Sequence, residues 1–333
     1  MQRSTLYIVI ASIAIILFLG IWGYFYLKSE HVQVPVNTNI EEEYIHPHTR
    51  SLDGVGVELE VDTNRKPVAF MIDNSSDARP SVGIENASLV YETIAEGSIT
   101  RQLAIFDPAN MPDIIGPIRS LRPYYLAWAK EVGAIVVHVG GSPEALLQVT
   151  NEYNINEFFS GQFFWRDKSR SAPHNVFTSN ENIKSAVQLY DYPTTTDILS
   201  WAYATTSPVF ATKADRFSVD FSIDEYRVDW EYDAEKGLYN RTVDGILEDV
   251  LVKNVIVQVV DVQVLDAELR RLLDLTGSDV AWVMRDGTVT IGHWIKGTKD
   301  KRTMFIDSEG NDISIAPGMT WVQVIDDVGR VSF

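Results

Sequence analysis

The sequence contains no cysteine and has fewer basic than acidic side chains. The lack of cysteine excludes a disulfide framework, a thiolate zinc site, a thiol nucleophile and the lipid-modified cysteine of a standard bacterial lipoprotein. The formal net charge of −18 excludes a typical nucleic-acid-binding surface, which is basic. The HExxH motif, a complete P-loop and the Gly-x-Ser-x-Gly elbow are also missing. We therefore expect no metal ion, no cofactor and no nucleic-acid partner.

Residues 4–27 form the one long apolar stretch without a charge, and about 20 such residues cross a bilayer. Aromatic residues gather between positions 22 and 26, as at a membrane interface, whereas a cleaved signal peptide would have small residues there. Acidic residues follow at position 30 and at 41–43. We therefore expect a single-pass protein of the cell membrane with an extracytoplasmic body.

Four regions follow from the changes in composition along the chain. Residues 1–28 form the anchor, and residues 29–65 are a polar linker with no helical or strand period. Residues 66–208 contain apolar runs, glycine loops and helical patterns, which predict an α/β (α+β) N-terminal domain. Residues 209–333 alternate in polarity and predict a smaller, mostly-β C-terminal domain, which could pair with the first.

Several local signals predict individual elements. Residues 123–131 and 180–189 have helical spacing, and residues 196–202 do so more weakly. The apolar strand at 134–139 ends at a Gly-Gly pair, and Ser142 followed by Pro143 starts a helix. An Asp-Gly pair at 286–287 predicts a hairpin.

Glu92 and Glu96 are the candidate acid and base. Two carboxylates at a suitable separation can cleave a glycosidic bond, with Glu92 as general acid and Glu96 as its partner. The alternative is that either carboxylate pairs with Arg101, Arg119 or Arg122 and holds loops in place.

Arg119, Ser120 and Arg122 precede the helix expected from position 123. Guanidinium forks at a helix start suit a carboxylate or phosphate, and Arg101 would add to this ligand-binding group. Ion pairs with Glu92 or Glu96 are an equally good interpretation.

His138 ends the apolar strand, directly before the loop Gly140-Gly141-Ser142. Strand ends of open α/β sheets form ligand crevices, and the backbone N–H groups of such a loop can bind an anion. A histidine that is hydrogen-bonded within the core is the commoner case.

A second turn contains Arg170, His174 and Asn175, which we predict to line the same pocket. Aromatic residues between 158 and 165 precede this turn. They fit a sugar-binding cleft, and a core or domain interface explains them equally well.

These groups together resemble the YerB-like family of bacterial extracytoplasmic proteins with paired domains of unknown function. The matching stretches are residues 67–74, 89–106, 116–124, 138–143, 164–175, 287–296 and 307–321. The resemblance implies an envelope location and a two-domain build, and it implies no particular reaction. Familiar members are lipoproteins, whereas this chain lacks cysteine.

The expected function is a membrane-anchored envelope protein that binds a cell-wall glycan and, if it is an enzyme, cleaves it as a glycan hydrolase or lytic-transglycosylase-like protein. The alternative is a non-catalytic binding or scaffold module for envelope proteins. A metal-dependent hydrolase is a third interpretation. The first expectation requires the acidic, guanidinium and imidazole groups to converge in one cleft.

Overall fold

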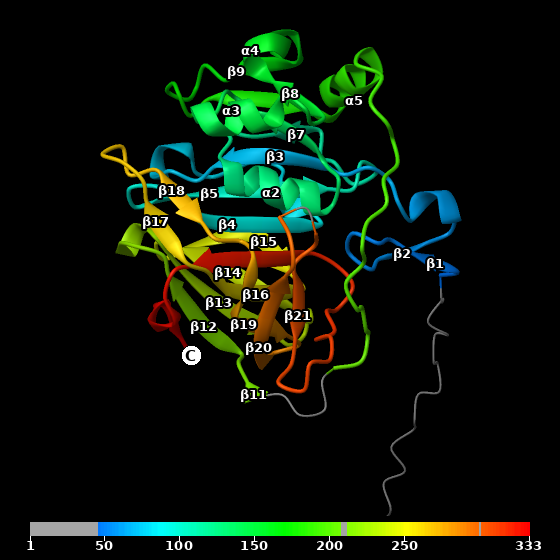
Figure 1. The fold of residues 1–333 in the computed structure, drawn as a ribbon, viewed down its shortest axis with the longest axis vertical. Helices are drawn as coiled ribbons and strands as arrows, with labels where there is room; N and C mark the ends of the chain where they lie inside the picture. Colours follow the sequence, from blue (N-terminus) through cyan, green and yellow to red (C-terminus); the bar gives the residue numbers. More distant parts are fainter. Residues whose placement is uncertain (1–45, 208–211, 300) are drawn as a thin grey trace, which may run out of the picture. The chain divides into compact units, whose positions relative to one another are not determined.

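The computed structural model describes residues 46–207, 212–299 and 301–333, which belong to one compact unit (Figure 1). The predicted transmembrane anchor at residues 1–28 and residues 29–45 of the predicted linker lie outside the described residues. Within the described part of the chain, no helix combines the length and apolar character needed to cross a membrane.

Residues 46–65, which the sequence predicts to be linker, pack on the body instead. They contain strands β1 (His48–Thr49) and β2 (Gly56–Val57) and the short 3-10 helix η1 (Glu60–Asp62). Leu52 is buried, and its carbonyl accepts a hydrogen bond of 3.1 Å from Arg302. The buried ion pair of Arg50 and Asp53, at 2.7 Å, lies beside it. These long-range contacts order a segment that has no periodic pattern of its own.

One central sheet of eleven strands contains strands from both halves of the chain (Figure 1). The first half contributes β3 (Val68–Asp73), β4 (Leu89–Glu96), β5 (Ile99–Phe106), β7 (Ile135–His138) and β8 (Asn154–Asn156). The second half contributes β11 (Thr212–Lys213), β16 (Asn254–Val259), β19 (Gly277–Arg285), β20 (Thr288–Lys296), β21 (Met304–Ile306) and β22 (Thr320–Ile325). The order is β11-β20-β19-β16-β22-β4-β5-β3-β7-β8, and β21 pairs with β20. The halves meet where β22 runs parallel to β4.

The helices α2 (Pro123–Glu131) and α5 (Asn180–Leu189) have the bounds that their spacing predicts. Helix α3 (Pro143–Val149) follows β7 and the Gly-Gly loop, and β8 then runs parallel to β7, which confirms the predicted α/β unit. Trp128 of α2 is fully buried, and its ring stacks on Tyr91 of β4 with centroids 4.8 Å apart. Helix α2 therefore packs its Trp128 face against the central sheet.

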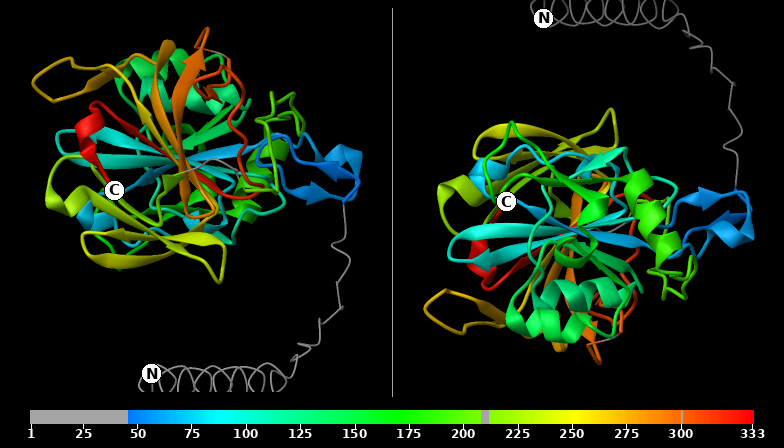
Figure 2. Two further views of the ribbon diagram at one scale, coloured as in Figure 1. Left: turned by 90° about the horizontal axis from the view of Figure 1, so that it is seen from below. Right: turned by 90° about the horizontal axis from the view of Figure 1, so that it is seen from above.

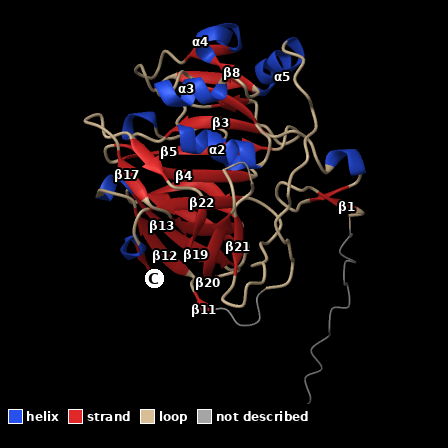
Figure 3. Cartoon of the chain, viewed as in Figure 1, coloured by secondary structure: helices blue, strands red, loops and turns tan. Residues whose placement is uncertain are grey.

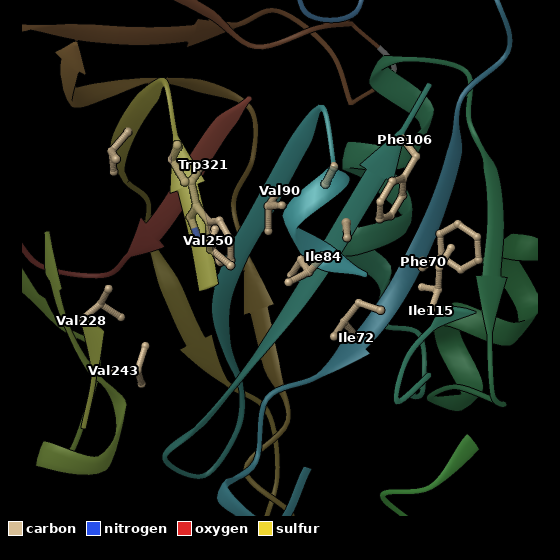
Figure 4. Packing of buried hydrophobic residues seen from close by; sticks show 14 of the residues in the cluster. Phe70, Ile72, Ile84, Val90, Phe106, Ile115, Val228, Val243, Val250 and Trp321 are labelled. Atoms are coloured by element: carbon tan, nitrogen blue, oxygen red, sulfur yellow. The ribbon is translucent and has the colours of Figure 1, made fainter. Parts of the chain in front are cut away.

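A second, antiparallel sheet packs against the central one. Its order is β15 (Ile246–Val252), β14 (Leu238–Val243), β13 (Arg227–Asp233), β12 (Arg216–Asp220) and β23 (Val331–Ser332). Buried residues alternate along β14, as expected for a strand with one face toward a core. Figure 4 shows Val228 and Val243 of this sheet in the same buried cluster as Val90 and Trp321 of the central sheet.

The remaining elements are short. They are β6 (Ile114–Ile115), β9 (Phe164–Arg166), β10 (Val176–Ser179), β17 (Val262–Val264), β18 (Arg271–Leu273), α4 (Glu157–Ser160), η2 (Ser76–Ala78), η3 (Ile84–Asn86), η4 (Gly161–Phe163), η5 (Asp224–Tyr226) and η6 (Val328–Arg330). Figure 2 shows the ribbon of the chain from below and from above.

The fold differs from the predicted class because strands dominate both halves (Figure 3). The two-part build is present, but the halves share one sheet. The weaker helix prediction at residues 196–202 is wrong. Trp201 is buried, and its indole N–H donates to the Thr303 carbonyl at 2.8 Å. Thr196 donates its N–H to Asn64. These contacts with distant residues hold the segment extended.

Candidate functional site

Glu92 lies inside the protein with none of its surface exposed. Arg241 Nη2 donates to both of its carboxylate oxygens, at 2.9 and 2.8 Å. The Trp321 indole N–H donates at 2.9 Å and the Asn74 amide at 3.0 Å. The Thr100 hydroxyl is a further donor, at 3.2 Å. The carboxylate predicted to be the general acid is thus surrounded by fixed donors and has no solvent contact.

Arg241 of β14 is equally buried and lies over the Trp321 ring, 4.4 Å from its centroid. It also pairs with Glu248 of β15. Burial alone would lower the pKa of Arg241, but Glu248 and Glu92 outweigh it and raise this pKa above its ordinary value. Arg241 and Glu92 therefore join the two sheets through a charged contact. Sequence reasoning predicted a mostly-β region here but missed that Arg241 stands at an inward position of β14, between Tyr239 and Val243.

Glu96 does not share a site with Glu92. The register of β4 and β5 shifts between Ile94 and Glu96, which breaks the alternation of the strand. Glu96 accepts from Arg101 at 3.0 Å and pairs with Arg122, the N-cap residue of α2. The two carboxylates therefore have different partners and do not flank a common hollow. The ion-pair interpretation of Glu96 with Arg101 and Arg122 matches the structure.

The residues that do converge surround Asp73, at the end of β3. Its Oδ1 accepts from the Ser75 N–H at 3.1 Å and from the Ser75 hydroxyl at 3.0 Å. Its Oδ2 lies 3.0 Å from Nε of Arg119 and 2.7 Å from Nδ1 of His174. We call Asp73, Ser75, Arg101, Arg119 and His174 the Asp73 cluster. Arg101 belongs to it because it faces Asp73 in the pairing of β3 with β5.

The electrostatics of this cluster keep Asp73 ionised. Burial alone would raise the pKa of Asp73, but the Ser75 N–H, the Arg119 guanidinium and His174 outweigh it and lower the pKa. Burial lowers the pKa of Arg119 and Asp73 opposes this change. Arg101 donates to the Ser120 carbonyl at 2.9 Å and links the cluster to Glu96. Three guanidinium groups, counting Arg122, thus stand beside two carboxylates.

Two groups of the cluster have donor or acceptor atoms to spare. Nη1 and Nη2 of Arg119 have no partner among the residues that the structure describes, and the side chain is 25% exposed. Nε2 of His174 also has no partner within this part of the chain, and its side chain is 17% exposed. Asp73 therefore contacts Arg119 through an ion pair at Nε and His174 through a hydrogen bond at Nδ1, and it does not use the outer atoms of either side chain.

Backbone contacts position Arg119 at the carboxyl ends of the parallel strands. Its N–H donates to Met71 of β3 at 2.8 Å, and its carbonyl accepts from Val139 at 3.0 Å. Such edges are where open α/β sheets place their ligands. Asp73 was missed as a site residue, although a carboxylate ending a buried apolar strand at this edge was a usable signal.

His138 and its glycine loop have partners within the protein. His138 is fully buried, and Nδ1 lies 2.7 Å from the Gly140 carbonyl. Burial lowers its pKa. The Gly140 N–H donates to Asn156, Gly141 bridges Leu121, and the Ser142 hydroxyl caps α3. The structure thus places these predicted ligand-binding residues in a packed loop and outside the Asp73 cluster.

Arg170 and Asn175 hold the loops on either side of His174. Arg170 donates to the Ala78 carbonyl at 2.5 Å and to the Pro80 carbonyl at 2.8 Å. Asn175 donates to the carbonyls of Asp167 and Arg170, both at 3.3 Å. These contacts hold the loop that carries His174 in place, so Arg170 and Asn175 stabilise the site through the backbone of neighbouring residues.

The aromatic stretch is divided between surface and core. Phe158 and Phe159 are 65% and 84% exposed, whereas Phe163 is buried. Trp165 stacks on Phe177, with centroids 6.3 Å apart.

Within the described residues, no group of three or more histidine, aspartate or glutamate side chains could hold a metal ion.

Comparison with known proteins gives consistent matches over the body. The family model described as "Protein of unknown function (DUF3048) N-terminal domain" matches residues 54–192, and its C-terminal counterpart matches residues 217–322. The chain is 30% identical over 294 residues to "Putative lipoprotein YerB" of Bacillus subtilis (strain 168), covering 84% of this chain and 87% of the relative. The crystal structure of YerB protein from Bacillus subtilis is similar with a TM-score of 0.77 and 28% identity, covering 86% of this chain and 99% of that one.

Proposed function

The chain belongs to the DUF3048 family, and from this premise we propose that it is a membrane-anchored envelope protein whose body binds an anionic cell-wall glycan. The Asp73 cluster would hold a carboxylate or phosphate of that glycan. The observation that carries the proposal concerns Arg119. Its Nε pairs with Asp73, while Nη1 and Nη2 have no partner among the described residues.

The envelope location has two supports. The relative from Bacillus subtilis is named "Putative lipoprotein YerB", and a lipoprotein attaches to a membrane through its lipid. This chain has no cysteine for such a lipid, but residues 4–27 are uncharged and long enough to cross a bilayer. A single-pass anchor with an extracytoplasmic body would give both proteins the same location by different attachments.

The local charge supports an anionic ligand. The whole chain has a formal charge of −18, yet guanidinium groups outnumber carboxylates around the Asp73 cluster. A guanidinium fork with free Nη atoms donates two hydrogen bonds to a carboxylate or phosphate. Because the ion pair with Asp73 restrains the side chain, less conformational entropy is lost when the anion binds.

Binding is a better proposal than cleavage by Glu92. A general acid must reach the glycosidic oxygen within hydrogen-bond distance, and Glu92 is enclosed by Arg241, Trp321 and Asn74. The Glu92–Glu96 pair therefore does not enter the proposal.

Co-sedimentation of the full-length protein with purified sacculi tests this function. We expect binding by the parent protein, a loss of about tenfold or more in affinity for Arg119→Gln, and no change for the exposed control Arg216→Gln. Sacculi with and without their phosphate polymers separate the two sources of the anion. If the parent protein sediments with neither preparation, the proposed function is wrong.

A scaffold role is the second candidate, and one surface favours it. Ile246 and Leu247 of the outer strand β15 are 68% and 65% exposed and line a cavity of about 670 Å³ beside Val82. Outer strands with exposed apolar residues pair readily with another chain. Capture of envelope proteins from membranes by the parent protein, and not by Leu247→Asp, would favour this role.

A further inference from the structure

The Asp73–His174 pair has the geometry of a histidine held for proton transfer. Nδ1 of His174 lies 2.7 Å from Oδ2 of the buried Asp73. An ionised carboxylate only accepts hydrogen bonds, so Nδ1 carries a proton, and in the neutral imidazole the lone pair is then on Nε2. Nε2 has no partner in the described part of the chain, and a lone pair so directed can remove a proton from water.

Ser75 completes the support of the histidine. Its hydroxyl lies 2.9 Å from Nδ1 of His174 and 3.0 Å from Oδ1 of Asp73. Because it stands on the Nδ1 side, the Ser75 hydroxyl cannot be the group that Nε2 deprotonates. It orients the pair, and water is the nucleophile that this geometry allows.

Nε of Arg119 and Nδ1 of His174 lie against the same carboxylate oxygen, Oδ2 of Asp73, so an anion-binding side chain and the histidine belong to one cluster. Arg101 lies close enough to lower the pKa of Arg119. A positive site beside a general base stabilises the charge that develops when water attacks a phosphorus atom.

We propose that the Asp73 cluster hydrolyses a phosphodiester. Nε2 of His174 takes a proton from water as the water oxygen forms a bond to phosphorus. The bond from phosphorus to the leaving alcohol oxygen breaks, and the imidazolium returns its proton to that oxygen. Arg119 binds the nonbridging oxygens throughout. The products are a phosphomonoester and an alcohol, and no oxidant, reductant or further reactant is consumed.

The substrate class follows from two requirements of the site. The guanidinium groups need a ligand that is charged before the reaction begins, and the histidine needs a bond that water can break. A carboxylate meets only the first requirement and a neutral carboxylic ester only the second, whereas a phosphodiester meets both. This inference rests on the proposed function, because it adds a reaction to the same anion site.

The experiment uses the full-length protein in detergent, with poly(glycerol phosphate) and bis(4-nitrophenyl) phosphate as probes. Phosphorus NMR distinguishes new phosphomonoester ends from the starting diester. We expect the parent protein to release them, His174→Gln to lower kcat about 10²-fold or more, and the exposed-site control His293→Gln to match the parent. Arg119→Gln should raise KM, and Arg119→Lys should recover part of that loss.

The unfolding temperature of His174→Gln tells a lost reaction from a lost fold. Failure of the parent protein to cleave either probe, or equal rates for the parent and a folded His174→Gln, overturns the inference. Cleavage of 4-nitrophenyl acetate alone overturns the substrate class. Binding to sacculi without hydrolysis leaves the proposed function in place, and hydrolysis without binding to sacculi removes only the proposed function.

Discussion

Arg241 Nη2 donates to both carboxylate oxygens of Glu92 across a sequence separation of 149 residues. The contact joins strand β14 of the second sheet to strand β4 of the central sheet, and both side chains are completely buried. Such a pair is costly to form and more costly to break, because removal of one partner leaves a buried charge.

Glu92→Gln should therefore destabilise the protein by about 3–5 kcal/mol, since Arg241 loses one of its two carboxylates. Chemical denaturation measures the change. Glu231→Gln, which removes an exposed partner of Arg216, should have little effect on stability. Sacculus binding by the folded variant should be unchanged. A variant of normal stability that has lost a glycan-cleaving activity would instead return Glu92 to a catalytic role.

Lys296 is a second buried charge that the sequence did not reveal, since a lysine on a strand is usually solvated. It is 2% exposed and lies 2.5 Å from Glu131 at the end of α2. Lys296→Met should cost about 3 kcal/mol or more, because Glu131 would be left as a buried carboxylate without a cationic partner, with only the neutral donors of Thr303 and Tyr91. Lys299→Met, at an exposed position nearby, is the matched control. Equal unfolding midpoints for the two variants would contradict this account of the pair.

His138 should make stability depend on pH. Burial lowers its pKa below the ordinary 6.5, so the unfolded chain takes up a proton at a higher pH than the folded protein does. The contribution of His138 is therefore favourable to folding at neutral pH and is lost as the pH falls below about 6.5. His138→Gln should flatten the fall in unfolding free energy between about pH 7 and pH 5. Parallel curves for parent and variant would show that His138 is not the group responsible.

Asp73 should change stability in the same direction as His138, but in a more acidic pH range. Its pKa is lowered from the ordinary 3.8, so the ionised form stabilises the folded state above that pH. Asp73→Asn should be less stable than the parent at neutral pH. The difference should shrink as the pH falls below about 3.8, where the parent carboxylate also becomes protonated. A difference that stays constant down to low pH would mean that shape rather than charge holds His174 and Arg119.

Most local elements could be read from the sequence because their signals are local. Ser142 caps α3 as predicted, and the Asp286-Gly287 pair turns the hairpin of β19 and β20 with positive φ at both residues. The helix 196–202 failed for the opposite reason. Its weak spacing was outweighed by the burial of Trp201 against residues about a hundred positions away.

The candidate site was predictable only in part. Arg101, Arg119 and His174 were expected to face a common anion site, and all three do surround Asp73. Asp73 itself was overlooked, because the residues next to it in the sequence do not show that Arg119 and His174 will contact it. Glu92 and Glu96 looked like a pair because they are four residues apart, and the register shift beside Ala95 separates them.

Spacing, capping residues and turn chemistry were enough to place helices α2, α3 and α5, the hairpin of β19 and β20 and several strands, since each depends on neighbours within a few residues. Which charges meet was decided by the packing of distant strands. Arg241 reaches Glu92 and His174 reaches Asp73 because strands and loops far apart in the chain pack together. A buried charge needs a partner, and the packing of distant segments determines which side chain that partner is.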